Sequence, residues 1–301
     1  ETSSTKEHLE GINFKALATK KYDNEESIYS NLSIQYCEPE LREGLFELEK
    51  AKNNQLPKLV ELSDLKGILH NHSTYSDGMN TLEEMAVYCK QLGYQYLGIC
   101  DHSKTASYAG GLKVETVLLQ QQEIEKLNKQ LFPFKIFKGI ESDILGNGDL
   151  DYEEDILKTF DFIVASVHAN LKMDEEKATT RLIKAIENPY TTILGHPTGR
   201  LLLGRPGYPI DHKKIIDACA ANKVVIELNA HPYRLDIDWR WIPYCLEKGV
   251  MISINPDAHQ LKGYHDMRYG TYVARKGLLT KDNCLNAMDL NTFENYLSTK
   301  K

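Results

Sequence analysis

Histidines and acidic residues recur where apolar segments of this chain end. His70 and His72 follow the apolar run that closes at Leu69, and Asp77 comes shortly after them. Apolar runs also end at Asp101-His102, Glu141, His168, His196 and Asp257-Ala258-His259. A parallel barrel gathers the carboxyl ends of its strands at one mouth, so we expect these side chains to meet there. Imidazoles and carboxylates without thiolates are typical ligands of zinc, manganese or iron.

Nine side chains make up the predicted metal site. They are His70, His72, Asp77, His102, Glu141, His168, His196, Asp257 and His259. Residues two apart in a strand face the same side, so His70 and His72 can bind one ion while Asn71 points away. Asp257 and His259 repeat this spacing, and a closed barrel would bring the two pairs together. A lone histidine at a strand end is more often structural, but six of the ten histidines share this placement.

The carboxylate of Glu141 is expected to bridge two ions. With such bridging, the nine ligands suit three divalent ions, and the sequence leaves open whether these are Mn²⁺, Zn²⁺ or Fe²⁺. Clustered divalent ions make hydroxide available near neutral pH and offset the charge of phosphate oxygens. The chemistry that this pattern favours is therefore phosphoester hydrolysis.

Other polar residues near the predicted strand ends are candidates for supporting roles. Asp101 is a catalytic candidate that could orient a ligand, accept a proton or cap a turn, and we favour orientation of a ligand. Four cationic side chains are expected on the mouth side as phosphate contacts or as solvated charges: Lys172, Arg200, Arg234 and Arg268. Arg200 and Arg234 are the best two, because guanidinium groups bind phosphate through paired hydrogen bonds. Weaker candidates for contacts with sugar or base are Tyr108, Arg205 and Tyr233.

Strand-like and helix-like segments alternate from Asp64 onward, which predicts βα units around a parallel sheet. The expected strands are Leu65–His70, Tyr94–Cys100, Phe134–Ile140, Phe162–Val167, Thr191–Leu194, Val224–Leu228 and Val250–Ile254. The expected helices are Thr81–Gln91, Val114–Leu131, Glu175–Asn188, Asp211–Ala221 and Ile237–Lys248. Seven such units favour a closed or nearly closed barrel. No Gly-x-Gly-x-x-Gly follows the first strand, which weakens a dinucleotide-binding alternative.

The first 60 residues differ from the rest. They are polar, with helical stretches expected near Glu25–Leu32 and Pro39–Lys52, and they contain too few apolar residues for an independent core. We interpret them as an arm or as the remnant of another domain. The chain does not begin with Met, so we expect it to be a fragment or a processed form.

Composition narrows the class of protein. A net charge of -7 argues against a broad basic face for duplex DNA, although bound cations would reverse the sign locally. The six cysteines form no Cys-x-x-Cys pair and are expected to be free thiols in a reducing cytoplasm. No apolar run approaches the ~20 residues of a membrane helix, and no signal peptide is visible, so a cytoplasmic protein without membrane partners is expected.

Seven short motifs together resemble the PHP (polymerase and histidinol phosphatase) superfamily. They are Leu69–Ser73, Ser76–Gly78, Cys100–Ser103, Gly139–Glu141, Ser166–His168, Gly195–Pro197 and Asp257–His259, in the family's order. The resemblance implies a distorted seven-stranded β/α barrel with a trinuclear metal site. The chain departs from the common pattern at Ser73, Cys100, His231 and Pro256, although all the ligand positions match. His231 could be an extra ligand or a substrate contact, but we favour a structural role or support of a ligand. Pro256 could alter the approach of Asp257.

Further segments resemble the PHP domain at the C-terminus of bacterial X-family DNA polymerases. They are Thr5–His8, Pro39–Glu43, Leu56–Glu61, Lys172–Asp174, Gly195–Arg200, Tyr233–Asp236 and Met267–Gly270. This likeness implies that residues 1–60 are a polymerase tail with its connector and that residues 61–301 are the PHP phosphoesterase domain. It also implies manganese-dependent 3′→5′ exonuclease or 3′-end processing activity on DNA, with a polymerase module upstream. Two alternatives are a phosphatase of small phosphomonoesters such as histidinol phosphate, and a non-catalytic module that supports a polymerase.

Overall fold

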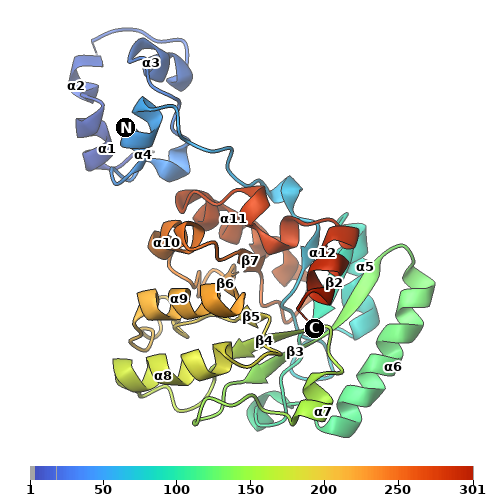
Figure 1. The fold of residues 1–301 in the computed structure, drawn as a ribbon. Helices are drawn as coiled ribbons and strands as arrows, with labels where there is room; N and C mark the ends of the chain where they lie inside the picture. The colour runs from blue at the N-terminus through green and yellow to red at the C-terminus, as the bar shows by residue number, and fades with distance from the viewer. Residues whose placement is uncertain (1–3, 18, 301) are drawn as a thin grey trace.

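The computed structural model describes residues 4–17 and 19–300, which form an α/β barrel and a smaller helical lobe (Figure 1). The barrel contains seven parallel strands that pair in sequence order. They are β1 (Gly67–Ile68), β2 (Tyr96–Ile99), β3 (Lys135–Asp143), β4 (Phe162–Ser166), β5 (Ile193–Leu194), β6 (Val225–Asn229) and β7 (Ile252–Asn255). Beyond the ends of β1 and β7, Asn71 pairs with Ala258, and the His72 N–H donates to the Ala258 carbonyl at 2.8 Å. The barrel is therefore nearly closed, as the sequence predicts.

Helices cover the outside of the barrel (Figure 1). They are α5 (Leu82–Gln91), α6 (Val114–Leu131), α7 (Glu154–Leu157), α8 (Glu175–Ile186), α9 (His212–Asn222), α10 (Ile242–Glu247) and α11 (Met267–Lys276). Side chains define where several of them begin. The Thr81 hydroxyl accepts a hydrogen bond from the Glu84 N–H at 3.2 Å, and the Glu84 carboxylate accepts one from the Thr81 N–H at 2.8 Å. This capping box satisfies N–H groups that a helix otherwise leaves unpaired.

The strands are buried on both faces, as helix-covered parallel strands must be. The last helix, α12 (Leu290–Ser298), contributes Phe293 and Leu297 to an apolar cluster that includes strand residues. The Phe293 ring stacks on Tyr96 with centroids 4.8 Å apart and meets Phe137 edge-on at 5.0 Å. Helix α12 thus packs against the amino-terminal starts of β2 and β3, opposite the strand ends that carry the candidate ligands.

Two predicted helices are shorter than expected. The segment Ile237–Lys248 was expected to be one helix, but it contains the short 3₁₀ turn η4 (Trp239–Trp241) and then α10. Pro243 stands in the first turn of α10, where a missing N–H costs least. Similarly, Pro39–Lys52 divides into η1 (Pro39–Leu41) and α4 (Glu47–Lys52). Gly44 lies between them at φ +74°, a conformation that ends a right-handed helix.

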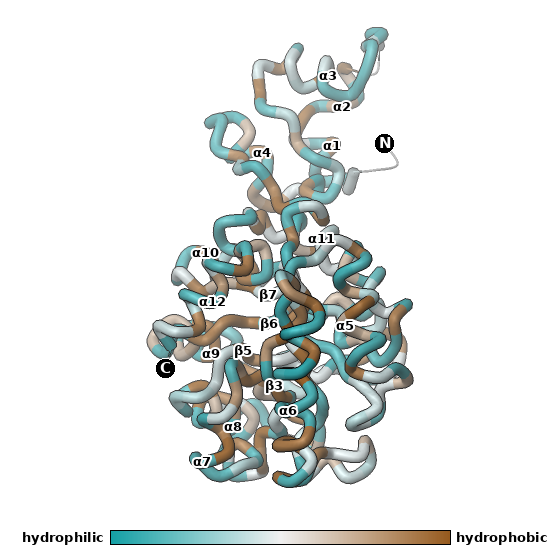
Figure 2. Tube along the Cα trace, turned by 90° about the vertical axis from the view of Figure 1, so that its right-hand side faces the viewer, coloured by the Kyte–Doolittle hydropathy of each residue, from teal (hydrophilic) through white to brown (hydrophobic). Residues whose placement is uncertain are grey.

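The N-terminal lobe contains α1 (Lys6–Gly11), α2 (Phe14–Leu17), α3 (Glu25–Asn31) and α4, and it projects from one end of the molecule (Figures 1 and 2). Its buried cluster includes Tyr29, Cys37 and Leu41, together with Leu278 from the barrel domain. The Arg275 Nε lies 2.8 Å from Glu40 Oε1, so ion pairing also joins the two parts. Among the described residues, no helix is long and apolar enough to cross a membrane.

Candidate metal centre

Glu141, near the end of β3, is surrounded by imidazoles that arrive from neighbouring strand ends. The Nε2 atoms of His196, His168 and His70 lie 3.0, 3.2 and 3.3 Å from its Oε1. Nδ1 of His102 lies 3.0 Å from its Oε2. Glu141 was expected to bridge two ions, and its two oxygens do contact different imidazoles of one cluster.

Two further carboxylates extend this cluster. Oδ1 of Asp257 lies 3.1 Å from His72 Nε2, and Oδ1 of Asp77 lies 3.4 Å from His259 Nε2. Three groups of potential ligand atoms, each within 4.8 Å of one another, are His72–Asp77–His102–His259, His70–His72–Asp257 and His102–Glu141–His168. His196 belongs to none of the three groups, although it contacts Glu141. The structure thus brings all nine predicted side chains together, and their role as ligands stays a prediction.

The backbone brings the pair His70 and His72 next to the pair Asp257 and His259, as expected for a closed barrel. The Asn71 side chain points away from the cluster, donating to the Gly98 carbonyl at 2.8 Å and accepting from the Tyr264 hydroxyl at 3.2 Å. Asp257 adopts a left-handed conformation at φ +51°, which Asp tolerates better than most residues. This turn, directly after Pro256, directs the Asp257 carboxylate toward His72.

Several buried atoms in this cluster have no partner with hydrogen-bond geometry among the described residues, although His70 Nε2 and His102 Nδ1 lie close to the Glu141 oxygens. These buried atoms are His70 Nε2, His72 Nδ1, His102 Nδ1, His196 Nδ1 and Glu141 Oε2. Buried polar groups are nearly always paired, and a group of unpaired ring nitrogens beside a carboxylate needs an explanation. Nitrogen and oxygen donors at this spacing fit divalent cations of the zinc, manganese and iron class.

The pKa values of several residues in the cluster are strongly shifted. Burial would lower the pKa of His102, but the charges of Glu141 and Asp77 raise it to about 10. Burial and the neighbouring His102 lower the pKa of His72 to about 3. Burial would raise the pKa of Glu141, yet the imidazoles of His168, His70 and His102 hold it well below its usual range. Imidazoles packed this closely cannot all carry a proton, so some ring nitrogens are available to bind a cation.

Two buried carboxylates contact the histidines on the side away from Glu141. The sequence analysis did not predict them. Glu227 Oε1, in β6, lies 2.6 Å from His70 Nδ1, and its other oxygen accepts the His196 N–H at 2.8 Å. Asp143 Oδ1, at the end of β3, lies 2.5 Å from His168 Nδ1. Carboxylates in this position set the tautomer of a metal-binding imidazole. An acidic residue within the apolar strand β6 was the available signal for Glu227, because unpaired carboxylates are almost never buried.

Asp101 is fully buried and organises the loop that carries Asp77. One of its oxygens accepts hydrogen bonds from the Ser73 N–H at 2.8 Å and from the Ser76 hydroxyl at 2.5 Å. The other accepts from the Ser73 hydroxyl at 2.7 Å and from Gln120 at 2.6 Å. Asp101 therefore orders the chain between His72 and Asp77, and its role in catalysis stays a prediction.

The predicted cationic residues have different surroundings. Arg234 Nε lies 3.3 Å from Asp257 Oδ2, and its buried Nη1 has no partner among the described residues. Arg200 instead donates to the carbonyls of Arg234 and Leu235 and pairs with Asp238 at 3.0 Å, which holds the loop after β6. Lys172 is exposed on the loop after β4. Arg234 is thus the cationic side chain with the most direct contact to the cluster.

The three weaker candidates for contacts with sugar or base lie in different places. Tyr108 is largely exposed, and its ring centroid lies 6.2 Å from that of His102. Tyr233 lies against His231, and His231 contributes to none of the three ligand groups. The Arg205 Nε donates to the Gly199 carbonyl at 3.2 Å.

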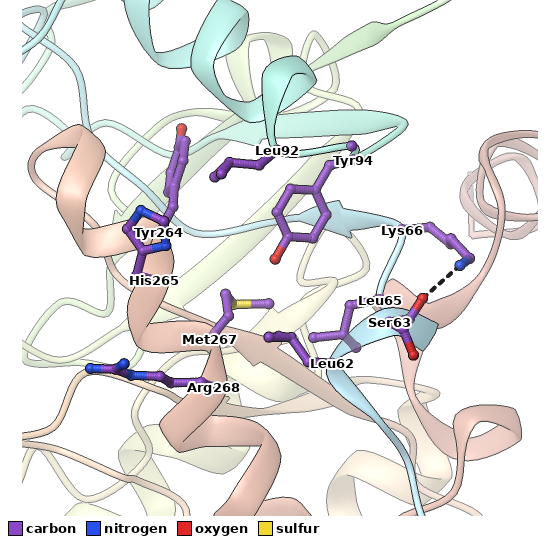
Figure 3. Close-up of a pocket in the computed structure, with 11 residues that line it drawn as sticks. Leu62, Ser63, Leu65, Lys66, Leu92, Tyr94, Tyr264, His265, Met267 and Arg268 are labelled. Atoms are coloured by element: carbon purple, nitrogen blue, oxygen red, sulfur yellow. Dashed lines mark hydrogen bonds between the residues drawn. The ribbon is translucent and has the colours of Figure 1, made fainter.

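Arg268 was expected on the mouth side, but it lines a hollow on the flank of the barrel (Figure 3). That hollow also includes Lys66 and Tyr94, which precede the first two strands, so it opens away from the strand ends. Arg268 stands in the first turn of α11 and donates to the Tyr269 hydroxyl at 2.6 Å, and its role as a phosphate contact stays a prediction.

A sequence profile of the PHP domain matches residues 69–231. The chain belongs to the PHP domain family. A probable phosphatase of Thermoanaerobacter sp. (strain X514) is 30% identical over 256 residues, covering 79% of this chain and 97% of that protein. The histidinol phosphate phosphatase of Lactococcus lactis, solved with zinc, L-histidinol and phosphate, superimposes with a TM-score of 0.52 at 16% identity, covering 70% of this chain and 94% of that one. The latter likeness concerns the fold alone.

The PHP chain also resembles a longer protein. The DNA polymerase/3′-5′ exonuclease PolX of Bacillus subtilis (strain 168) is 39% identical over 278 residues, which is 92% of this chain. This PHP chain spans about half of that protein's length, 48%. The fold and these relatives place the chain among the metal-dependent phosphoester hydrolases of the PHP family.

Proposed function

We propose that this chain hydrolyses phosphodiester bonds at the 3′ end of DNA, using the cluster around Glu141 to hold three divalent ions. The observation that carries the proposal is the convergence of buried imidazoles from separate strand ends on the Glu141 carboxylate, where several ring nitrogens lack hydrogen-bond geometry to any described residue. Bound divalent ions would lower the pKa of water and offset the charge of a phosphate. Manganese is the metal that we expect, with zinc and iron as alternatives.

The side chains around the cluster have distinct parts in this proposal. Glu141 and Asp257 keep the imidazoles close together through their negative charges. Arg234 contacts Asp257, and its Nη1 has no partner among the described residues, so its guanidinium would bind a phosphate oxygen beside the cluster. Lys172, on the exposed loop after β4, would add a second positive charge for the nucleic acid backbone. Arg200 would act indirectly, by holding the loop that carries Arg234.

The similarity to PolX supports DNA as the substrate. That match covers 92% of the chain, more than residues 61–301 provide, so it extends into the N-terminal lobe. We therefore propose that residues 1–60 are the end of a polymerase module with its connector, and that residues 61–301 are the PHP domain. The six cysteines are free and buried, which suits the reducing cytoplasm where such an enzyme would act.

A small-molecule phosphatase is the second candidate. The relative from Thermoanaerobacter supports it, because the match covers 97% of a protein that is named as a probable phosphatase. That match covers only 79% of this chain, about the share that residues 61–301 make up. The N-terminal lobe, which such a phosphatase does not require, favours the DNA substrate.

A paired substrate assay with Mn²⁺ separates the two candidates. We expect a 5′-labelled oligonucleotide to be shortened from its 3′ end one nucleotide at a time, and histidinol phosphate to be cleaved slowly. Metal content per chain is measured on the same sample. Rapid monoester cleavage without nucleotide release would contradict the DNA substrate, and absence of bound metal and of both reactions would contradict the metal-dependent mechanism.

His70→Ala and Asp257→Ala should abolish hydrolysis while circular dichroism shows a retained fold, because each removes a predicted ligand. His212→Gln is the matched control, since His212 stacks on Trp241 at 4.6 Å and belongs to none of the ligand groups. We expect wild-type activity from His212→Gln. Unchanged turnover in His70→Ala would contradict the catalytic role of the cluster.

A further inference from the structure

His196 differs from the two other histidines whose Nε2 faces Oε1 of Glu141. His70 and His168 each have Nδ1 on a buried carboxylate, namely Glu227 and Asp143. Nδ1 of His196 is buried without a hydrogen-bond partner among the described residues. A metal-binding imidazole almost always donates its second N–H to a carboxylate, a carbonyl or a water. The acceptor for His196 is therefore missing from the protein contacts.

Asp236 lies against the turn that follows His196. Its Oδ2 accepts hydrogen bonds from the Thr198 N–H and from the Thr198 hydroxyl, both at 2.9 Å. Its Oδ1 is buried and has no partner in the described part of the chain. Thr198 stands two residues after His196, so these hydrogen bonds place Asp236 beside the turn that carries His196.

Tyr208 supplies a third unpaired group at the same turn. The Tyr208 N–H donates to the Thr198 carbonyl at 3.0 Å, which anchors the residue beside Asp236. Its hydroxyl is buried and likewise lacks a partner within the described residues. Burial and then the charge of Asp236 raise the pKa of this phenol. Asp236 and the backbone of Tyr208 thus both bind Thr198, two residues after His196. Asp236, Tyr208 and His196 each have one buried atom without a partner among the described residues.

We propose that one buried water links Nδ1 of His196, Oδ1 of Asp236 and the hydroxyl of Tyr208, and that Asp236 thereby positions His196. Three hydrogen bonds are the usual number for a buried water. The link would give His196 the carboxylate support that His70 and His168 receive directly. The inference rests on the proposed function, because His196 needs a fixed tautomer only where its Nε2 binds a metal.

Metal affinity tests the link through two variants and a control. Zn²⁺ binding is measured by competition with a chelator for Asp236→Asn, Tyr208→Phe and Tyr96→Phe. We expect Asp236→Asn to weaken the site that contains His196 by about 10–100-fold. Tyr208→Phe should cause a smaller loss, because two hydrogen bonds of the water remain. Tyr96→Phe should bind as the wild type does, since Tyr96 donates to the Met288 carbonyl away from the cluster.

Wild-type affinity in both Asp236→Asn and Tyr208→Phe would overturn the inference. If Asp236→Asn does not fold, Tyr208→Phe decides, because it removes only one hydroxyl group. A high-resolution crystal structure of the wild type adds a readout that is independent of affinity. A water within hydrogen-bond distance of all three atoms is expected, and a different donor at Asp236 Oδ1 would contradict the link.

The two hypotheses fail in different ways. A wild-type protein that binds no Zn²⁺ or Mn²⁺ contradicts the proposed function, whatever the crystal structure shows between Asp236 and His196. A metal-loaded protein that lacks the water contradicts only the role of Asp236.

Discussion

Individual carboxylates decide how the histidines of this cluster are oriented. Asp143 Oδ1 meets Nδ1 of His168, so the opposite ring nitrogen faces Glu141. The Asp143 carboxylate also accepts the Thr105 hydroxyl at 2.9 Å, which ties it to the loop after β2. A side chain held from two directions keeps the imidazole in one orientation, and a fixed orientation lowers the entropy cost of binding an ion.

Asp143→Asn should weaken metal binding by about 10–100-fold, since an amide is a weaker acceptor for the imidazole N–H and does not favour one tautomer. Isothermal titration with Mn²⁺ measures the change. Asp149→Asn is the matched control on the same hairpin, because Asp149 pairs with Lys184 at the surface, 2.8 Å away. Equal affinities for the two variants would show that Asp143 does not orient His168.

At the scale of elements, the parallel barrel brings distant parts of the chain to one site. Most of the strands are short, and β1 and β5 contain only two residues each by their hydrogen bonding. Stability must therefore come from the helices outside and from α12 at the amino-terminal ends of the strands. Phe293 is completely buried against Tyr96 and Phe137, so α12 closes this end of the barrel with aromatic packing.

Phe293→Ala should lower the free energy of unfolding by about 3–5 kcal/mol, because the cavity it leaves cannot be filled by the flat rings beside it. Urea unfolding followed by circular dichroism measures this loss. Leu119→Ala, on the exposed face of α6, is the control and should change the free energy by less than about 0.5 kcal/mol. A small effect of Phe293→Ala would mean that α12 is not part of the cooperative core.

At the scale of the whole molecule, the N-terminal lobe is organised around a buried carboxylate of its own, which makes several hydrogen bonds. The buried Glu47 carboxylate lies 2.7 Å from His8 Nδ1 and accepts the N–H groups of Gly44 at 2.7 Å and Leu45 at 3.0 Å. Burial would raise the pKa of Glu47, but these hydrogen bonds lower it below its ordinary value of 4.5. A carboxyl whose pKa is lower when folded stabilises the fold above its ordinary pKa, and this contribution is lost as the pH falls further.

The lobe should therefore open as the pH falls below about 4.5, where the unfolded state takes up the proton more readily. Hydrogen exchange of amides in α1 and α4 at pH 7 and pH 4 measures this locally, apart from the acidic residues of the barrel. Glu47→Gln should exchange faster at pH 7 and change less between the two pH values. An unchanged difference in Glu47→Gln would assign the pH dependence to other carboxyl groups.

The local pattern predicted the seven strands and the helices α5, α6, α8 and α9, but it did not predict α11 or α12. Helix α6 begins and ends where its periodicity predicts, at Val114 and Leu131. The nine candidate ligands stand at strand ends, and parallel strands in a barrel deliver their carboxyl ends to one side whatever the details of packing. The left-handed backbone at Gly44 and the proline in α10 were the local features that shortened two expected helices.

Only the tertiary structure decided which atoms support the ligands. Glu227 and Asp143 are ordinary acidic residues in the sequence, and their histidine partners lie on other strands or loops. The position of Arg268 was also beyond the sequence, because α11, which carries it, lies beside residues that precede β1 and β2. Residue spacing determines direction within one strand, but the distance between side chains on different strands depends on how the strands twist and stagger. The sequence therefore predicted which side chains lie in the same cluster, whereas their individual contacts depend on the tertiary structure.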